Sequence, residues 1–449
     1  MTQYDFGQVA WLPINKGFSI AGVPCSADTF EQSGSSVLHM KFCAKTPTIA
    51  NPRSVGGKFT KPPCRQTGQI NKRQTLEIKL DKNIHQKLYG LDHLRALAIV
   101  FVFLFHYFIL SGGQPEWLPD FAKFGWTGVD LFFVLSGFLI SSQLFAQIKQ
   151  GQKISFKHFF LKRFFRIVPA FLVTVGLYFC IPFFREKESL PPLWKFLTFT
   201  QNLGLNLKDF GTFSHAWSLC VEEHFYLFLP IILIVLQFTN SIKKSYWLLI
   251  ALFLFGFAIR IYSFNQLYLP KIEDENGWMY WYKYIYYPTY NRLDGLLVGV
   301  SIAGIYQFLP IFWSKISKYG NLFVLLSLLV LTGSYFLCYD QMTFNASVFG
   351  FPLIAIGYGF MVVGVVSPTS FLYKWNSKVT TFIATLSYAT YLTHKGIIHM
   401  THQLLADFKI DNNLMLLICM VMCVIFAYLL HLTIEKPFMK LRKRILEPK

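Results

Sequence analysis

The dominant feature of this sequence is the recurrence of apolar stretches about 20 residues long. A helix of that length rises about 30 Å, which matches the hydrocarbon core of a bilayer. Only 14% of the 449 residues are charged, whereas ordinary soluble domains carry about 25%. An all-α, polytopic membrane bundle of about ten transmembrane helices is predicted, with spans near 94–112, 129–146, 165–184, 215–237, 246–264, 284–306, 321–339, 344–366, 382–401 and 413–434.

The basic residues of the loops predict how these helices are oriented. Segment 147–164 carries five lysines and arginines, and segment 436–449 carries six. Every second loop is basic in this way, whereas the intervening loops hold most of the acidic residues. By the positive-inside rule, both termini are expected in the cytoplasm and the number of spans is even. Because the turn between the seventh and eighth stretches is very short, nine or eleven spans are the alternatives.

The net charge of +19 has the same origin. In a soluble protein this charge would suggest nucleic-acid binding, but basic loops that set topology and contact anionic lipid account for it here. We therefore expect a multi-pass protein of the plasma membrane, the inner membrane of a bacterium. The lipid bilayer is its expected partner, and no nucleic-acid partner is expected.

Residues 1–85 differ from the rest of the chain. Gly, Pro, Ser, Gln and Lys are scattered there without a sustained apolar period, and no signal-peptide pattern is found. A disordered N-terminal extension over 1–85 and a membrane domain over 86–449 are therefore expected. No pair of cysteines with metal-ligand spacing is supported by a second pair, so no metal site is predicted.

The stretch LRALAIVFVFLFHYF (94–108) carries Arg95 and His106 among apolar residues. Eleven residues make almost three helical turns, so both side chains lie on one face, roughly 16 Å apart along the axis. Ionisable residues inside membrane segments are costly and usually functional. A polar seam that runs into the membrane is therefore predicted on this helix.

Further ionisable residues are expected at the depth of His106. Segments 125–140, 214–230 and 288–299 carry them in from the outer side, and segment 386–396 rises from the cytoplasmic side. Such groups coexist in a low dielectric only when they pair or line a wet cavity. The members of this layer are Asp130, His215, Glu222, Glu223, Arg292, Asp294 and His394.

Most of these residues also have a structural interpretation. Asp130 could cap the second helix from its first turn, and His215 could be interfacial. Arg292 and Asp294 could pair with residues of other helices as structural contacts, and His394 could be a structural histidine.

A second cluster is expected at the cytoplasmic face. In FLKRFFRIVPA (160–170), Arg163 and Arg166 are three residues apart and share one side of a helix. Guanidinium pairs bind phosphate through forked hydrogen bonds. The alternative is that both arginines are ordinary anchors of the positive-inside kind.

These stretches together resemble acyltransferase family 3, a family of integral membrane acyltransferases. The resemblance covers roughly residues 88–445, and seven motifs in order make it specific. They are LDHLRALAIVFVFLFHY, GWTGVDLFFVLSGFLI, FLKRFFRIVPA, WSLCVEEHFYLFLP, RLDGLLVG, LSYATYLTHKG and a final IEKPF.

The resemblance implies an O-acyltransferase. The family moves an acyl group, often acetyl, from a cytoplasmic thioester to a hydroxyl of a surface polysaccharide, lipopolysaccharide, peptidoglycan or a macrolide. Its arginine–ten residues–histidine motif matches Arg95 and His106, and its arginine–two residues–arginine motif matches Arg163 and Arg166. Its Trp-Ser-Leu…Val-Glu stretch matches Trp217, Ser218, Val221 and Glu222.

Two departures from the family are visible. The extension over 1–85 has no recognised counterpart in the family. No SGNH-type esterase domain follows the last span, so a periplasmic hydrolase-like partner is expected to be a separate chain.

The charges and the resemblance together suggest a mechanism. His106 is expected to be the general base, or a transient acyl carrier in a ping-pong reaction. Glu222, with Asp130 or Glu223, is expected to orient and stabilise its imidazole. The remaining polar site residues have no assigned role: Trp217, Ser218, Arg292, Asp294 and His394.

The expected donor is acyl-CoA, with acetyl-CoA as the first choice. Arg163 and Arg166 are expected to hold its phosphates, and Arg95 to guide its pantetheine arm inward. The expected acceptor is a hydroxyl of a sugar or glycan, and no permanently bound cofactor is expected. Aromatic residues of the outer loop 265–283 could stack on such a sugar, or form an interfacial belt.

Two other function classes compete with this one. A proton- or solute-coupled transporter also places His, Asp and Glu inside the membrane, as a proton relay. A scaffold or receptor leaves the intramembrane charges unexplained. Binding of acetyl-CoA separates the enzyme from the transporter.

Overall fold

The computed structural model describes residues 88–110 and 114–446. All regular secondary structure within these ranges is helical, which confirms the predicted all-α fold. Eight of the described helical segments are long and apolar enough to cross a bilayer, as expected of a multi-pass membrane protein. The extension predicted for 1–85 lies outside the described residues.

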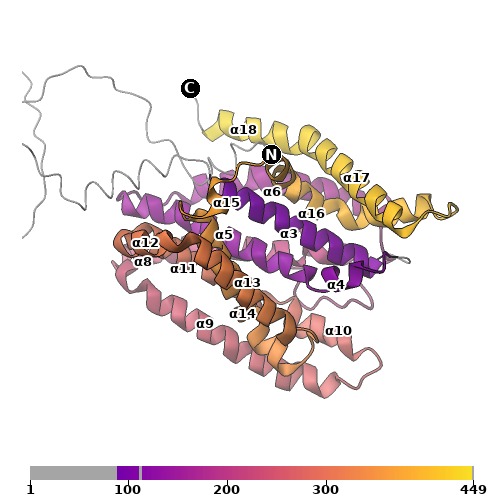
Figure 1. The fold of residues 1–449 in the computed structure, drawn as a ribbon, viewed down its shortest axis with the longest axis horizontal. Helices are drawn as coiled ribbons and strands as arrows, with labels where there is room; N and C mark the ends of the chain where they lie inside the picture. The colour runs from indigo at the N-terminus through magenta and orange to yellow at the C-terminus, as the bar shows by residue number, and fades with distance from the viewer. Residues whose placement is uncertain (1–87, 111–113, 447–449) are drawn as a thin grey trace, which may run out of the picture. The chain divides into compact units, whose positions relative to one another are not determined.

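Each predicted apolar stretch overlaps one long helix of the described chain (Figure 1). These helices are α3 (Tyr89–Leu110), α5 (Gly128–Lys149), α6 (Phe156–Cys180), α8 (Trp217–Phe238), α9 (Ser245–Tyr262), α11 (Asp294–Phe308), α13 (Gly320–Leu337), α14 (Phe351–Val366), α16 (Lys378–Leu404) and α17 (Asn412–Leu430). Shorter helices connect or follow them: α4 (Leu118–Ala122), α7 (Leu193–Leu197), α10 (Gly277–Trp281), α12 (Pro310–Ile316), α15 (Phe371–Lys374) and α18 (Lys436–Leu446).

The largest departure from the prediction is at 284–306, where α11 begins only at Asp294. A π turn (Tyr282–Tyr286) and a 3-10 turn (Thr289–Asn291) precede it. Pro288 lies between the two turns. Proline has no N–H group to donate and disfavours the helical conformation of the residue before it. Pro288 itself has an extended backbone conformation (ψ 132°), so the helix is interrupted at this point. The membrane segment therefore contains a stretch of non-helical backbone just before α11.

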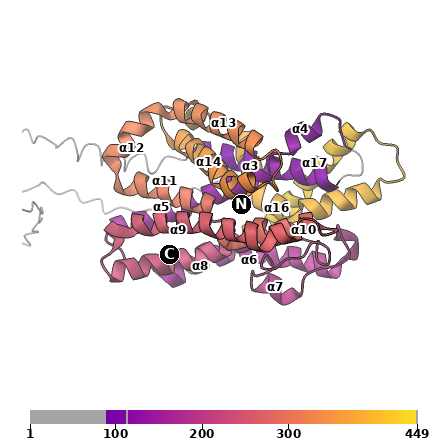
Figure 2. The same ribbon diagram turned by 90° about the horizontal axis from the view of Figure 1, so that it is seen from below.

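The helices pack in a fixed order around α5 and α11. In Figure 2, α13 and α14 lie on one side of these two helices, and α7 and α8 lie on the other. In Figure 1, α9 runs along one edge of the bundle and α17 along the opposite edge. Helix α3 packs against α5 and α16, so the first and ninth predicted spans are neighbours in space.

Glycines allow α5 and α11 to approach closely. Gly295 and Gly299 are four residues apart on α11, the spacing at which small residues let membrane helices touch backbone to backbone. A Cβ atom on Gly299 would clash with the backbone of Val134 and come within 2.5 Å of the Phe138 nitrogen. A Cβ atom on Gly137 would clash with the carbonyl oxygen of Leu296.

This contact yields a stability prediction. Gly299→Ala should lower the melting temperature of the detergent-solubilised protein, because the new methyl group forces α5 and α11 apart. Gly333→Ala is the matched control, since Gly333 lies on α13 with open space around its Cα. The control should leave stability unchanged or raise it by about 0.5–1 kcal/mol, the usual gain of Ala over Gly in a helix. Equal melting temperatures for both variants would contradict the packing argument.

Candidate active site

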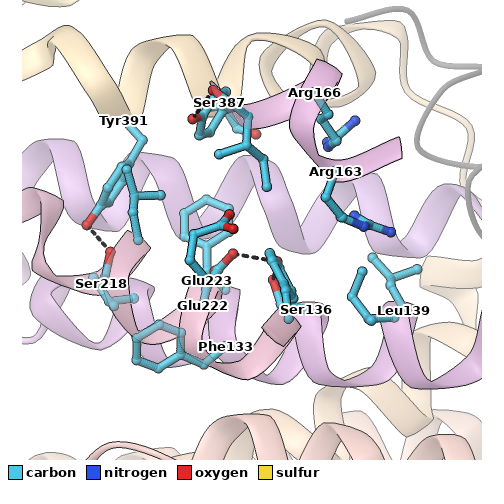
Figure 3. Close-up of a pocket in the computed structure, with 17 residues that line it drawn as sticks. Phe133, Ser136, Leu139, Arg163, Arg166, Ser218, Glu222, Glu223, Ser387 and Tyr391 are labelled. Atoms are coloured by element: carbon cyan, nitrogen blue, oxygen red, sulfur yellow. Dashed lines mark hydrogen bonds between the residues drawn. The ribbon is translucent and has the colours of Figure 1, made fainter. Parts of the chain in front are cut away.

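Two neighbouring cavities inside the bundle are each lined by several polar residues. The first, here called the arginine cavity, lies among α5, α6, α8 and α16 and is lined by Arg163, Arg166, Glu222 and Glu223 (Figure 3). The second, here called the histidine cavity, is lined by His106 and His215 and has a volume of about 280 Å³. Both cavities are lined by Val129 and Tyr391, so these two residues lie at their common wall.

Three imidazole rings meet at the histidine cavity. The ring centroid of His106 is 4.8 Å from that of His394 and 5.7 Å from that of His215, and the latter two are 4.9 Å apart. Among the described residues, no group of three or more His, Cys, Asp and Glu side chains is placed to hold a metal ion. The rings come from α3, from α16 and from the 3-10 turn Ser214–Ala216.

His106 is held through one ring nitrogen. Its Nδ1 lies 2.9 Å from the carbonyl oxygen of Val102 and 3.0 Å from Nε2 of His394. Its Nε2 has no hydrogen-bond partner among the residues that the structure describes. His106 is half-buried and lines the cavity, so this nitrogen is available to a bound molecule.

A strained residue positions His215. Phe213 has a left-handed backbone conformation (φ 54°), which is costly for a residue with a large side chain. Its N–H donates to Oε1 of Glu186 at 3.0 Å, and its ring stacks on Tyr178 with centroids 4.3 Å apart. These contacts fix the turn that begins at Ser214 and direct His215 into the cavity.

An ion pair lines the histidine cavity beside this turn. Nζ of Lys395 lies 2.8 Å from Oε1 of Glu186 and donates to Oγ of Ser214 at 3.2 Å. Both ends of the pair line the cavity. Neither residue was among the predicted site residues, although Lys395 follows His394 directly in the sequence.

The arginine cavity places guanidinium groups at one end and hydroxyl groups at the other. Figure 3 shows Arg163 and Arg166 on one side, the bonded pair Ser218 and Tyr391 on the other, and the two glutamates between them. Ser218 Oγ and Tyr391 Oη are 2.5 Å apart, and Tyr391 also donates to the carbonyl oxygen of His215 at 2.7 Å. The hydrogen bond from Tyr391 to His215 holds α16 against the turn that carries His215, at the wall between the two cavities.

The contacts of Arg163 involve only some of the N–H groups of its guanidinium. It donates to Oε1 of Gln143 at 3.4 Å and lies over the rings of Phe159 and Tyr226. Its Nε is buried and has no hydrogen-bond partner within the described part of the chain. The charges of Arg163, Arg95 and Arg442 act on Arg166, and so does the opposite charge of Glu435, so arginines outnumber carboxylates around Arg166. The arrangement suits a bound anion.

The structure separates several residues that were expected to act together. Glu222 accepts a 2.6 Å hydrogen bond from Tyr226 in the arginine cavity and does not contact His106. Arg95 lies 2.9 Å from Asp92, and neither of the two cavities is lined by Arg95. The expectation that a carboxylate orients His106 must therefore be corrected, because His394 and Val102 hold its Nδ1.

Asp130 and Asp294 are each bound to a buried arginine. Asp130 lies 2.8 Å from Nη2 of Arg292, and Asp294 lies 2.6 Å from Nη1 of Arg260. The guanidinium of Arg292 also lies over aromatic rings at centroid distances of 4.0 Å (Phe351), 4.5 Å (Tyr286) and 5.2 Å (Trp217). These pairs match the structural interpretation given above for Arg292 and Asp294. Arg260 was missed, although an arginine inside an apolar stretch is itself a signal.

The ion pair between Asp130 and Arg292 yields a second stability prediction. Asp130→Asn leaves a buried guanidinium without its counterion, which typically costs about 3 kcal/mol or more. The melting temperature should fall clearly. The double variant Asp130→Asn/Arg292→Gln should recover part of the loss, because no unpaired charge remains. A single variant with wild-type stability would show that the pair does not hold the bundle together.

Comparison with known proteins agrees with these observations. A family model described as an acyltransferase domain matches residues 88–432. The chain is 29% identical over 335 residues to the peptidoglycan O-acetyltransferase OatA of Listeria monocytogenes, and 29% identical over 338 residues to the O-acetyltransferase OatA of Staphylococcus aureus strain NCTC 8325. A protein of Staphylococcus aureus strain COL that carries an O-acetyltransferase name is 30% identical over 374 residues.

These matches cover most of this chain but only part of each relative. They span 70%, 69% and 78% of this chain, respectively, and 49%, 50% and 57% of the relatives. The chain thus spans about half the length of the curated relatives it matches. No solved structure matches. Since the family model covers well over half of the sequence, the chain belongs to acyltransferase family 3.

Proposed function

We propose that this protein transfers an acyl group, acetyl as the first choice, from acyl-CoA to a hydroxyl group of a sugar or glycan. The observation that carries the proposal is the pair of cavities with a common wall. One cavity holds two arginines, which suit the phosphates of the donor, and the other holds an imidazole with a free nitrogen. The O-acetyltransferase names of the relatives support the same reaction.

In this proposal the donor binds from the cytoplasmic side. The basic segment 147–164 contains Arg163 and ends two residues before Arg166. By the positive-inside rule, this segment is expected in the cytoplasm. The phosphates bind at these arginines, and the pantetheine arm extends along the arginine cavity toward Ser218 and Tyr391. The thioester then lies at the common wall, beside Val129.

The acceptor binds in the histidine cavity. Its hydroxyl oxygen attacks the thioester carbonyl carbon while Nε2 of His106 takes the hydroxyl proton. The C–S bond then breaks, the new ester bond remains, and the CoA thiolate leaves and takes up the proton from the imidazolium. The cavity is lined by several aromatic residues: Trp126, Trp217, Trp278, Tyr282, Tyr286 and Tyr287. Trp278 is the exposed member of this set, and its ring supports a sugar as acceptor because a pyranose can stack on it.

The competing transporter hypothesis is less well supported. Among the ionisable residues expected to form a relay, Asp130 and Asp294 are both bound to arginines. A carboxylate in a close ion pair is poorly suited to exchange protons. Binding of acetyl-CoA to the purified full-length chain in nanodiscs separates the two functions, since a transporter of protons or small solutes has no need to bind it.

His106→Ala should abolish acyl transfer. Loss of a general base typically costs about 10²- to 10⁴-fold in rate. The measurement is transfer of labelled acetyl from acetyl-CoA, together with mass spectrometry of surface glycans for the loss of an acetyl mark of about 42 Da. The control is His402→Ala on α16, a histidine that contacts Tyr107 and is not a lining residue of the two cavities. A wild-type rate for His106→Ala would refute the assignment.

Arg163→Ala and Arg166→Ala should mainly raise the apparent KM for acyl-CoA. Lysine at either position should restore the affinity only in part, since a lysine cannot form the forked hydrogen bonds of a guanidinium. Lys157→Ala is the matched control: Lys157 is an exposed basic residue on the same helix and lines neither cavity. If all three alanine variants behave alike, the arginines are ordinary topology anchors.

A further inference from the structure

The ring of His394 occupies the place in which a carboxylate was expected. It is fully buried, it contacts His106 through one nitrogen, and it is not a lining residue of either cavity. A bound substrate is therefore not expected to touch it. Its effect on the reaction can only act through its neighbours, and its closest functional neighbour is His106.

The hydrogen bonds determine which nitrogen of His394 carries the proton. Nδ1 lies 3.0 Å from the carbonyl oxygen of Thr390 and 2.9 Å from that of Tyr391. Carbonyl oxygens only accept hydrogen bonds, so Nδ1 of His394 must be the donor. In the neutral ring, Nε2 then has a lone pair and can only accept.

The same reasoning determines which ring nitrogen of His106 carries the proton. Its Nδ1 lies 3.0 Å from the unprotonated Nε2 of His394 and 2.9 Å from the carbonyl oxygen of Val102. Both partners accept, so Nδ1 of His106 carries the proton, and Nε2 is the unprotonated nitrogen. This is the nitrogen that has no partner within the described residues and that the proposed reaction uses as base.

We infer that His394 is a positioning residue, which together with the carbonyl oxygen of Val102 fixes the tautomer and orientation of His106 so that Nε2 can accept the hydroxyl proton. The inference rests on the function proposed above and assigns to a second imidazole the role that a carboxylate plays in a Ser-His-Asp triad. A neutral partner suits this depth in the membrane, because a buried carboxylate would need its own counterion. When His106 becomes protonated, its Nδ1–H still donates to His394 and Val102.

The first test compares two substitutions of His394. Methionine has a similar volume and cannot accept a comparable hydrogen bond, whereas the side-chain oxygen of glutamine can. His394→Met should lower kcat at least tenfold and leave the KM for acyl-CoA and for the acceptor within twofold. His394→Gln should restore most of kcat. His402→Met, the same change two turns along the same helix, should keep the wild-type kcat.

Two outcomes of this test would overturn the inference. One is a wild-type kcat in His394→Met. The other is an equal loss of kcat in the methionine and glutamine variants together with an equal loss of thermal stability, which a merely structural histidine would give.

The second test does not depend on activity. Nitrogen NMR of ¹⁵N-histidine-labelled protein in nanodiscs distinguishes an Nδ1-protonated ring from an Nε2-protonated ring, with the His106 signal assigned by its loss in His106→Ala. We expect the Nδ1-protonated form in the wild type and in His394→Gln. In His394→Met only the carbonyl oxygen of Val102 still accepts from Nδ1–H, so we expect a larger share of the Nε2-protonated form than in the wild type. An Nε2-protonated His106 in the wild type would overturn the inference. If the wild-type protein shows the Nδ1-protonated His106 but transfers no acyl group, the proposed function fails and the role of His394 in fixing the ring stands.

Discussion

The cost of a buried charge governs the arrangement of this bundle. Arg260 and Arg292 are almost completely inaccessible, and each is bound to a carboxylate at less than 3 Å. The first pair joins α9 to α11, and the second joins the segment before α11 to α5. An ion left without its partner at this depth would cost several kcal/mol, so the helices cannot separate without breaking these pairs. The close contact of α5 with α11 at Gly137 and Gly299 joins the same two parts of the bundle as the ion pair between Asp130 and Arg292.

These ion pairs determine which carboxylates can act elsewhere in the site. Asp130 is bound to Arg292 and therefore does not orient His106. The glutamates of α8 face the arginine cavity, where the positive charge is concentrated. The carboxylate that lines the histidine cavity with His106 is that of Glu186, which is paired with Lys395, and two other imidazoles lie beside His106. A network of neutral rings avoids the desolvation cost that a further acid would add.

The sequence predicts the helices better than it predicts their partners. Long apolar stretches can be recognised in the sequence because a helix that crosses the bilayer needs about 20 apolar residues. All ten predicted stretches overlap a helix of the described chain. The late start of α11 was missed because average hydropathy does not respond to Pro288. Spacing predicts Arg163 and Arg166 on one side of a helix, and both line the arginine cavity. Spacing and topology also predict a depth for Asp130 and His106, but depth does not specify which way a side chain points around its helix. The ion pairs depend on that direction, so the partner of Asp130 could not be read from the sequence.

The two cavities are built from different kinds of structure. The arginine cavity is lined by residues of four long helices, whereas much of the histidine cavity is lined by connecting segments, including Glu186, Leu207, Gly211 and Trp278. Connecting segments tolerate substitution and insertion far better than packed helices do. Related chains can therefore change the lining of the histidine cavity through substitutions in these segments while the arginine cavity stays the same. Under the proposed function, such a division would let related chains bind different acceptors while the site for the acyl donor stays the same.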